Sequence, residues 1–109
     1  MEPDAVRGHL DALVLAVLEH EPRHGYAIME ALRASSGGSL DVPTGTLYPA
    51  LRRLERAGYI RGQWDTVGGR RRRTYRLTAT GRRGLAAQRT AWRDFAAVIE
   101  RVLRPAPSG

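Results

Sequence analysis

The stretch from Gly45 to Gly58 combines an apolar and a polar face at helical spacing. Leucines stand at positions 47, 51 and 54, and these intervals place them on one side of an α-helix. Hydroxyl and guanidinium groups fall mostly elsewhere around the helix, at Thr46, Tyr48, Arg52, Arg53 and Arg56. The pattern is typical of an ordinary amphipathic helix with a solvated basic side, and equally of a DNA-recognition helix.

The start of this helix is ambiguous because Pro49 lies near its beginning. Proline lacks an N–H and is tolerated in the first turn, which makes Thr46 the expected N-cap. Thr44 is the competing start, and it would leave Pro49 to interrupt or bend the helix. Gly58 is expected to follow the helix C-terminus in either case, because glycine adopts the left-handed conformation most readily.

Two further amphipathic segments precede this helix. The first runs from Val6 to Glu19 and is ended by the turn 20–23, which contains Pro22. The second begins near His24-Gly25 and runs to Arg33, and the Ser- and Gly-rich stretch 35–39 breaks it. The apolar positions of the two segments are Leu10, Leu13, Val14, Val17 and Leu18, then Ile28, Met29 and Leu32. Helix, turn, helix and then the stretch 45–58 is the order of a helix-turn-helix.

After Gly58 the period of the pattern changes to two, which predicts a β-hairpin. Ile60, Gly62 and Trp64 alternate with polar residues, Val67-Gly68-Gly69 makes the turn, and the returning strand runs to Leu77. That strand opens with four consecutive arginines, Arg70, Arg71, Arg72 and Arg73. A hairpin directly after a helix-turn-helix is a wing, although near its tip the pattern does not distinguish which arginines point toward DNA.

The last helix is expected over residues 79–104, with Thr78 as its cap and Pro105 after its end. Its apolar positions are spaced like a heptad seam: Leu85, Trp92, Phe95, Ala96, Ile99, Val102 and Leu103. Dimerisation through this helix explains the pattern, and folding back onto the chain's own core is the alternative. We therefore expect a winged helix-turn-helix domain over 1–78, a dimerisation helix over 79–104 and a disordered tail over 105–109.

Charge is unevenly distributed along the 109 residues, whose formal net charge is +7. All 18 basic residues are arginine, which suits phosphate and guanine recognition, although a GC-rich genome would also favour arginine over lysine. The segment 52–93 carries 13 arginines against Glu55 and Asp65, whereas the first 51 residues are slightly acidic. This segregation suggests one face turned toward a polyanion.

Several functional classes find little support in the sequence. There is no cysteine, which excludes disulfides and thiolate zinc sites. No Ser-His-Asp order or phosphate-binding loop is recognisable, and Pro22 breaks the helical spacing by which His20 and His24 would share a metal with Glu21. The apolar runs are too short for a membrane span and the acidic start is unlike a signal peptide. We expect a cytoplasmic protein that is not an enzyme and has neither metal nor cofactor.

An ordered set of motifs resembles the PadR family of winged-helix transcriptional regulators, in its compact type with one C-terminal helix. The matching residues are His24-Gly25-Tyr26, then Gly45-Thr46-Leu47-Tyr48-Pro49 with Leu51, Arg53, Leu54, Glu55 and Gly58, then Gly69-Arg70-Arg71-Arg72 and Tyr75, and finally Leu77-Thr78 and Gly81. Many relatives have a serine ahead of the Gly-Thr-Leu-Tyr run, where this chain has Pro43-Thr44. The resemblance implies a bacterial protein in which the third helix starts near residue 43 or 44, with Pro49 inside it.

The expected fold is thus mainly α with a small β-hairpin, a winged helix-turn-helix followed by a long helix. The resemblance implies a homodimeric repressor that inserts the third helix into the major groove of a pseudo-palindromic operator on double-stranded DNA. Arg52 is expected to bind a guanine edge or a phosphate, and Arg53 to bind DNA or a carboxylate of the protein. The hydroxyl groups of Tyr26 and Tyr48 are expected to donate to phosphate. The candidate DNA-binding residues are Tyr26, Thr44, Thr46, Tyr48, Pro49, Arg52, Arg53, Arg70, Arg71, Arg72 and Arg73.

The resemblance also suggests a planar, apolar effector near the dimer interface, although an interfacial aromatic such as Trp92 more often simply packs. The expected ligand and dimer residues on the last helix are Trp92, Phe95, Ala96, Ile99, Val102 and Leu103, facing Leu10 and Val14 of the first helix. The alternatives are a non-specific nucleic-acid-binding protein, for which few stacking aromatics are present, and a winged helix that binds protein.

Overall fold

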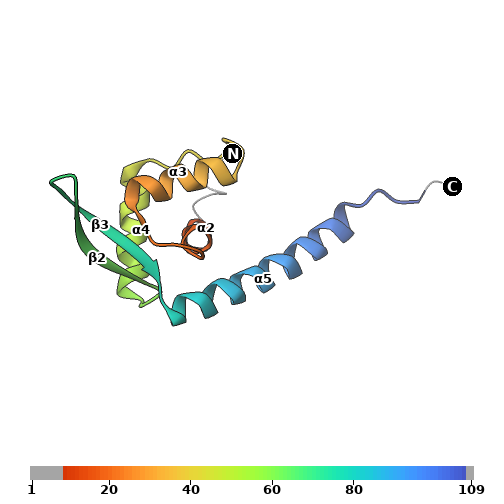
Figure 1. Cartoon of the computed structure of the whole chain (residues 1–109). Helices are drawn as coiled ribbons and strands as arrows, with labels where there is room; N and C mark the ends of the chain where they lie inside the picture. The colour runs from red at the N-terminus through yellow and green to blue at the C-terminus, as the bar shows by residue number, and fades with distance from the viewer. Residues whose placement is uncertain (1–8, 108–109) are drawn as a thin grey trace.

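The computed structural model describes residues 9–107 and has the expected mainly α fold with a small sheet. Its helices are α2 (Leu10–Val17), α3 (Gly25–Ser35), α4 (Thr44–Arg56) and α5 (Ala79–Leu103), and its strands are β1 (Arg23–His24), β2 (Ile60–Val67) and β3 (Arg70–Leu77). Three helices and the sheet form a body at one end, and α5 runs away from it (Figure 1). None of the helices in this part of the chain is long and apolar enough to cross a membrane.

The core forms where the apolar faces of α2, α3 and α4 meet the base of the hairpin. Leu47, Leu51 and Leu54 of α4 are almost fully buried, together with Ile28 of α3. Burying one such side chain contributes about 1.5–3 kcal/mol. The leucine spacing therefore fixes which side of α4 faces inward and leaves its polar side in solvent, as the sequence pattern predicts.

Helix α4 begins at Thr44 and contains Pro49, so the start at Thr46 expected from proline chemistry is wrong and the start implied by the PadR resemblance is confirmed. The carbonyl of Pro43 accepts hydrogen bonds from the N–H groups of Thr46 and Leu47, at 3.0 and 2.9 Å. Pro49 cannot donate to the carbonyl of Gly45, four residues back. Because Gly45 is exposed in the first turn, water can reach that carbonyl.

Gly58 ends α4 as expected. Its φ is +84°, and the Tyr59 N–H donates to the Leu54 carbonyl at 2.9 Å while the Gly58 N–H donates to the Glu55 carbonyl at 3.0 Å. These two bonds form a Schellman motif, which satisfies the last carbonyls of the helix. The chain then leaves α4 directly into β2.

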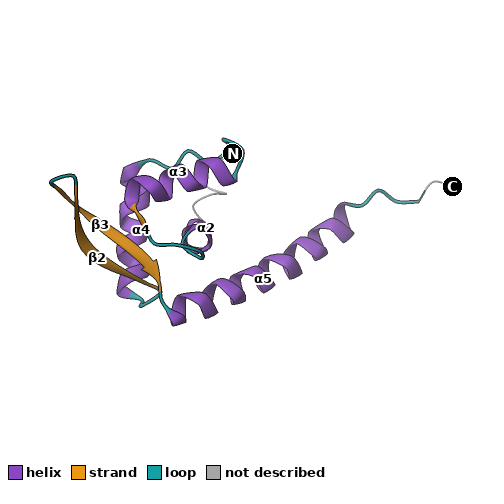
Figure 2. Cartoon of the chain, viewed as in Figure 1, coloured by secondary structure: helices purple, strands orange, loops and turns teal. Residues whose placement is uncertain are grey.

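The expected hairpin is present, but its turn contains only Gly68-Gly69, because Val67, expected in the turn, pairs with Arg70 at the end of β2. Both glycines have positive φ, +59° and +78°, as a type I′ turn requires. Trp64 pairs with Arg73 and Gly62 with Tyr75 across the strands. The short strand β1 was not expected; it pairs with the other edge of β3 and makes the sheet order β1-β3-β2 (Figure 2).

Besides the start of α4, three helix ends differ from expectation, and that of α5, at Leu103, comes one residue before the expected end at residue 104. Helix α2 ends at Val17, before the turn that contains Pro22, because the Leu18 and Glu19 N–H groups bond the carbonyls three residues back. Helix α3 continues two residues past Arg33 to Ser35. The expected start of the first helix at Val6 lies outside the described residues, as do the last two residues of the expected tail.

Helix α5 has the expected N-cap, Thr78, whose hydroxyl oxygen accepts from the Gly81 N–H at 3.0 Å. The same threonine joins α5 to the end of α4, because its N–H donates to the Tyr59 carbonyl at 3.1 Å. The molecule extends 69 × 28 × 21 Å, and a compact chain of this length would be far less elongated. The alternative in which the last helix folds back along its whole length is therefore wrong.

Gly81 should be essential to the junction between α5 and the hairpin. A Cβ at this position would lie 2.0 Å from the Tyr59 carbonyl oxygen, which the Thr78 N–H already holds. We expect Gly81→Ala to lower the free energy of unfolding by about 1–3 kcal/mol, measured by urea denaturation followed by circular dichroism. Gly45→Ala is the control, since nothing lies within 4 Å of a Cβ there; equal stability of the two variants would contradict this packing.

Candidate nucleic-acid interface

The N-terminal half of α4 presents a polar surface opposite its buried leucines. Thr44, Tyr48 and Arg52 are exposed, and Thr46 and Pro49 are partly buried. Residues 44, 48 and 52 are four apart and therefore share one side of the helix. The structure thus brings Thr44, Tyr48 and Arg52 together on one exposed side of α4, whereas Thr46 and Pro49 lie further around the helix and are partly buried.

Tyr48 lies against the start of α3, which explains why Gly25 stands between His24 and Tyr26. A Cβ at Gly25 would be 2.4 Å from the Tyr48 hydroxyl oxygen, so only glycine lets the tyrosine ring approach this closely. Tyr26 is 62% exposed beside this contact. The two tyrosine motifs recognised in the sequence therefore meet in space at the junction of α3 and α4.

Arg53 has a carboxylate partner, as one of its two expected roles requires. Its Nη2 donates to Oδ1 of Asp11 at 2.9 Å, which links α4 to α2. Both side chains are about half exposed, so the pair contributes about 0–1 kcal/mol to stability. Arg52 has no carboxylate within 4.0 Å among residues 9–107, so its guanidinium is available to an external anion.

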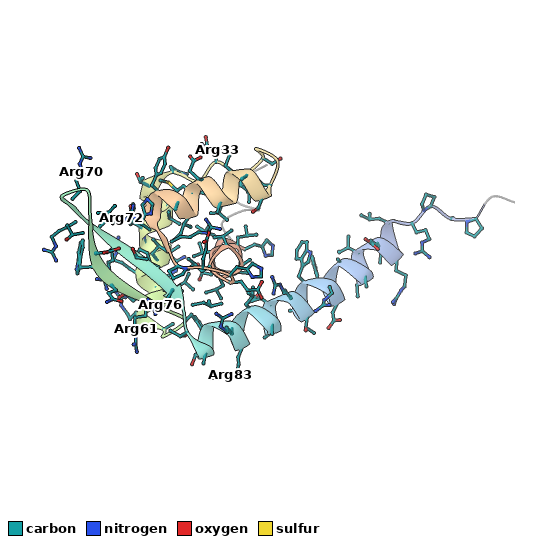
Figure 3. The ribbon with its side chains drawn as sticks, in the orientation of Figure 1. Arg33, Arg61, Arg70, Arg72, Arg76 and Arg83 are labelled. Atoms are coloured by element: carbon teal, nitrogen blue, oxygen red, sulfur yellow. The ribbon has the colours of Figure 1, made fainter. Side chains whose placement is uncertain are left out.

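The four wing arginines occupy two different environments. Arg70 and Arg71 are exposed, whereas Arg72 and Arg73 are partly buried. Figure 3 shows Arg70 at the free end of the hairpin and Arg72 on the side nearer α3. The side chain of Arg73 turns toward α4 and pairs with Glu55, which raises its pKa. Exposure and contacts thus separate the four arginines, which the sequence pattern did not distinguish.

His24 and Arg72 form a basic edge where β1 enters α3. Burial, and secondarily the charge of Arg72, lower the pKa of His24. The Nε atom of Arg72 is buried and has no hydrogen-bond partner in the described part of the chain. Lowering the pKa of His24 favours its neutral form at neutral pH, so arginine supplies the positive charge at this edge.

Three residues that matter to the wing were not among the sequence candidates: Glu55, Gly62 and Trp64. The Cζ atoms of Arg71 and Arg73 lie 4.8 and 5.5 Å from the ring centroid of Trp64. A Cβ at Gly62 would lie 2.4 Å from the Nε atom of Arg73. The two-residue alternation places Gly62 and Trp64 on the same side of the hairpin as Arg71 and Arg73. This alternation is the sequence pattern from which their contact with the arginines could have been predicted.

Helix α5 carries an exposed apolar surface, which we call the α5 surface. Its side chains are more than one-third exposed: Trp92, Phe95, Val98, Ile99, Val102 and Leu103. Ala96 is partly buried. Leu10 and Val14, expected to face these residues at the interface from either subunit, are only 2% and 0% exposed because the chain's own core covers them. That part of the expectation is corrected.

A shallow groove of about 400 Å³ lies between α2 and α5, and other residues of α2 line it. Its apolar lining comes from Ala12, Leu13, Ala16, Leu85 and Trp92, and its rim from Gln88, Arg89 and Arg93. Trp92 contacts Phe95 at 5.8 Å between ring centroids and His9 at 5.1 Å. The α5 surface therefore continues from this groove toward the C-terminus.

The direction of α5 is supported by an ion pair with the turn that follows α2. Nη1 and Nη2 of Arg89 donate to the two carboxylate oxygens of Glu19 at 2.8 and 2.9 Å, which lowers the pKa of Glu19. Arg82 adds a 3.2 Å bond to the Glu19 carbonyl. No cluster of three potential metal ligands occurs among residues 9–107.

Comparison with known proteins identifies the family. A sequence profile described as the transcriptional regulator PadR-like family matches residues 14–87. The chain belongs to this family. Among curated relatives, the uncharacterized protein X of Lysinibacillus sphaericus is 30% identical to this chain over 98 residues. The match covers 89% of this chain and 90% of that protein. A transcriptional regulator of Mycobacterium tuberculosis is 46% identical over 55 residues, covering 50% and 51%.

Solved structures of transcriptional regulators, including a PadR family member, have the same fold as this chain. A transcriptional regulator from Clostridium thermocellum superimposes with a TM-score of 0.86 at 29% identity, covering 93% of this chain and 99% of that one. A PadR family transcriptional regulator from Eggerthella lenta has a TM-score of 0.82 at 34% identity, covering 94% and 88%. The resemblance first recognised from short motifs thus extends over nearly the whole chain, including α5.

Proposed function

We propose that this PadR-like protein is a homodimeric, sequence-specific DNA-binding repressor. The observation that carries the proposal is the juxtaposition of an exposed polar half of α4 with an arginine-bearing hairpin. Thr44, Thr46, Tyr48, Pro49 and Arg52 enter the major groove, and the hairpin lies along the adjacent backbone or minor groove. Repression rather than activation rests on family resemblance alone.

The residues divide between base and phosphate contacts. Arg52 is the best candidate for a guanine edge, because an unpaired guanidinium matches the two acceptors of guanine. Tyr26 and Tyr48 offer hydroxyl donors to phosphate, which fix the register of the protein on DNA. Arg53 is a secondary candidate, since binding DNA would require it to exchange or share Asp11.

Selection of bound DNA from a random pool tests this function. We expect enrichment of a pseudo-palindrome whose half-sites are about one turn, roughly 34–36 Å, or a multiple of one turn apart. The selected sequence should be preferred over random DNA by at least about 10³ at physiological salt. Binding without a motif would indicate a non-specific nucleic-acid-binding protein, and no binding at all would favour a winged helix that contacts protein.

The α5 surface supports a dimer. Val102 and Leu103 are 77% and 75% exposed, and the surface continues into the groove beside Leu13. Contiguous apolar patches of this kind commonly mark interaction sites. In a two-fold dimer, the distal part of α5 from each protomer would cover the groove of the other.

Two substitutions, each of which adds one carboxylate, test the two sides of α5 independently. We expect Ile99→Asp to weaken dimerisation at least about 100-fold, because a carboxylate would be buried among apolar side chains. Ala97→Asp is the matched control, since it lies on the opposite side of the helix and is exposed. Sedimentation equilibrium measures both. A dimer unaffected by Ile99→Asp would contradict an interface on this side of α5.

A planar, apolar effector is proposed for the groove that contains Trp92. The groove is lined mainly by aliphatic and aromatic side chains, and an indole ring offers a flat stacking surface. In protein carrying Trp64→Phe, Trp92 is the remaining tryptophan, and we expect saturable quenching of its fluorescence by flat aromatic compounds. An unchanged spectrum across such a panel would assign Trp92 to packing alone.

A further inference from the structure

Five residues between α4 and the hairpin are connected by contacts, and we call them the Trp64 cluster: Glu55, Gly62, Trp64, Arg71 and Arg73. Glu55 belongs to α4, Gly62 and Trp64 to β2, and both arginines to β3. Trp64 lies directly opposite Arg73 and diagonally opposite Arg71, which pairs with Thr66, and its ring contacts both guanidiniums. The set therefore runs from the C-terminal half of α4 toward the wing tip.

Arg73 is surrounded by the protein. Its guanidinium pairs with Glu55, lies 5.5 Å from the Trp64 centroid and lies 6.0 Å from the centroid of Tyr75, a core residue. The side chains of Arg73 and Glu55 are only 29% and 32% exposed. Gly62 provides the space for this arrangement, because a Cβ there would overlap the Arg73 Nε atom. A planar guanidinium is suited to binding a carboxylate and stacking on rings together.

Arg71 differs from Arg73 although both contact the same ring. Its Cζ lies 4.8 Å from the Trp64 centroid, its side chain is exposed, and no carboxylate lies within 4.0 Å of it among residues 9–107. A stacked guanidinium retains its outward N–H donors. Stacking on Trp64 also restricts the rotamers of Arg71, which reduces the entropy lost when it binds an anion.

From this arrangement we infer that Arg73, stacked on Trp64 within the wing, is a positioning residue that holds the wing to α4 through Glu55, and that Arg71 is the arginine that Trp64 presents to a DNA phosphate. The inference rests on the proposed DNA-binding function and assigns different roles within the same site. Without the contact between Arg73 and Glu55, the hairpin would be joined to α4 chiefly through its base at Ile60 and Tyr59. The angle between the wing and α4 would then vary. A smaller fraction of the protein would have the wing and α4 oriented to contact the DNA duplex together.

The dependence of affinity on salt separates the two arginines. Each phosphate neutralised contributes about −0.9 to the slope of log affinity against log salt concentration. In a dimer, Arg71→Ala should therefore reduce the magnitude of the slope by about 1.8. Arg73→Ala removes the same charge from the same side of β3, but it should leave the slope unchanged while weakening binding roughly 2- to 30-fold, the range expected for residues that act on a site without touching the ligand.

Two further variants leave Arg73 in place and release it from its contacts. Glu55→Gln removes the partner, and Gly62→Ala fills the space without changing the charge. If Arg73 positions the wing, both variants weaken binding and Glu55→Gln combined with Arg73→Ala is no worse than Arg73→Ala alone. If instead Arg73 binds phosphate, both variants free it, binding strengthens, and Arg73→Ala flattens the slope. That second pattern would overturn the inference.

A measurement without DNA distinguishes failure of this inference from failure of the proposed function. In protein labelled with fluorotryptophan, the two tryptophans give separate ¹⁹F resonances, and Trp64→Phe identifies that of Trp64. Glu55→Gln and Arg73→Ala should both shift and narrow the Trp64 resonance and leave that of Trp92 unchanged. If the unsubstituted protein binds no DNA, the proposed function is wrong. If the Trp64 resonance is unaltered in both variants, Arg73 does not have the positioning role.

Discussion

Burial of the leucine face of α4 is the interaction on which the other features depend. Leu47, Leu51 and Leu54 pack against α2 and α3, and this contact sets the rotation of α4 about its own axis. A helix turned by one residue, about 100°, would bury its polar side. The exposure of Tyr48 and Arg52 is thus a consequence of apolar packing on the opposite side of the same helix.

Much of the fold could be predicted because local chemistry and tertiary packing agree. Gly58 ends α4 through a positive φ, Gly68-Gly69 makes the hairpin turn, and Thr78 caps α5, each by a mechanism that is readable in a few residues. The start of α4 was one exception. Proline chemistry alone favoured Thr46, whereas the helix begins at Thr44; because Gly45 is exposed, the carbonyl that Pro49 leaves unbonded can be tolerated there.

The site was harder to predict because it depends on contacts between distant residues. Helical spacing marks Leu10 and Val14 as apolar, but it cannot tell whether the chain's own core or a second protomer covers them. Four adjacent arginines look equivalent in sequence, yet Arg73 lies within reach of Glu55, 18 residues away, and Arg70 does not. Strand β1 is only two residues long, too short for a recognisable alternation.

The exclusive use of arginine on the wing means that its charge does not respond to pH. Guanidinium groups remain protonated throughout the physiological range, and the nearby His24 has a lowered pKa that favours its neutral form. Lysine acetylation, which cancels charge in many nucleic-acid-binding proteins, has no substrate in this chain. In the proposed dimer, a displacement of α5 would change the separation and orientation of the two wings without altering their charge.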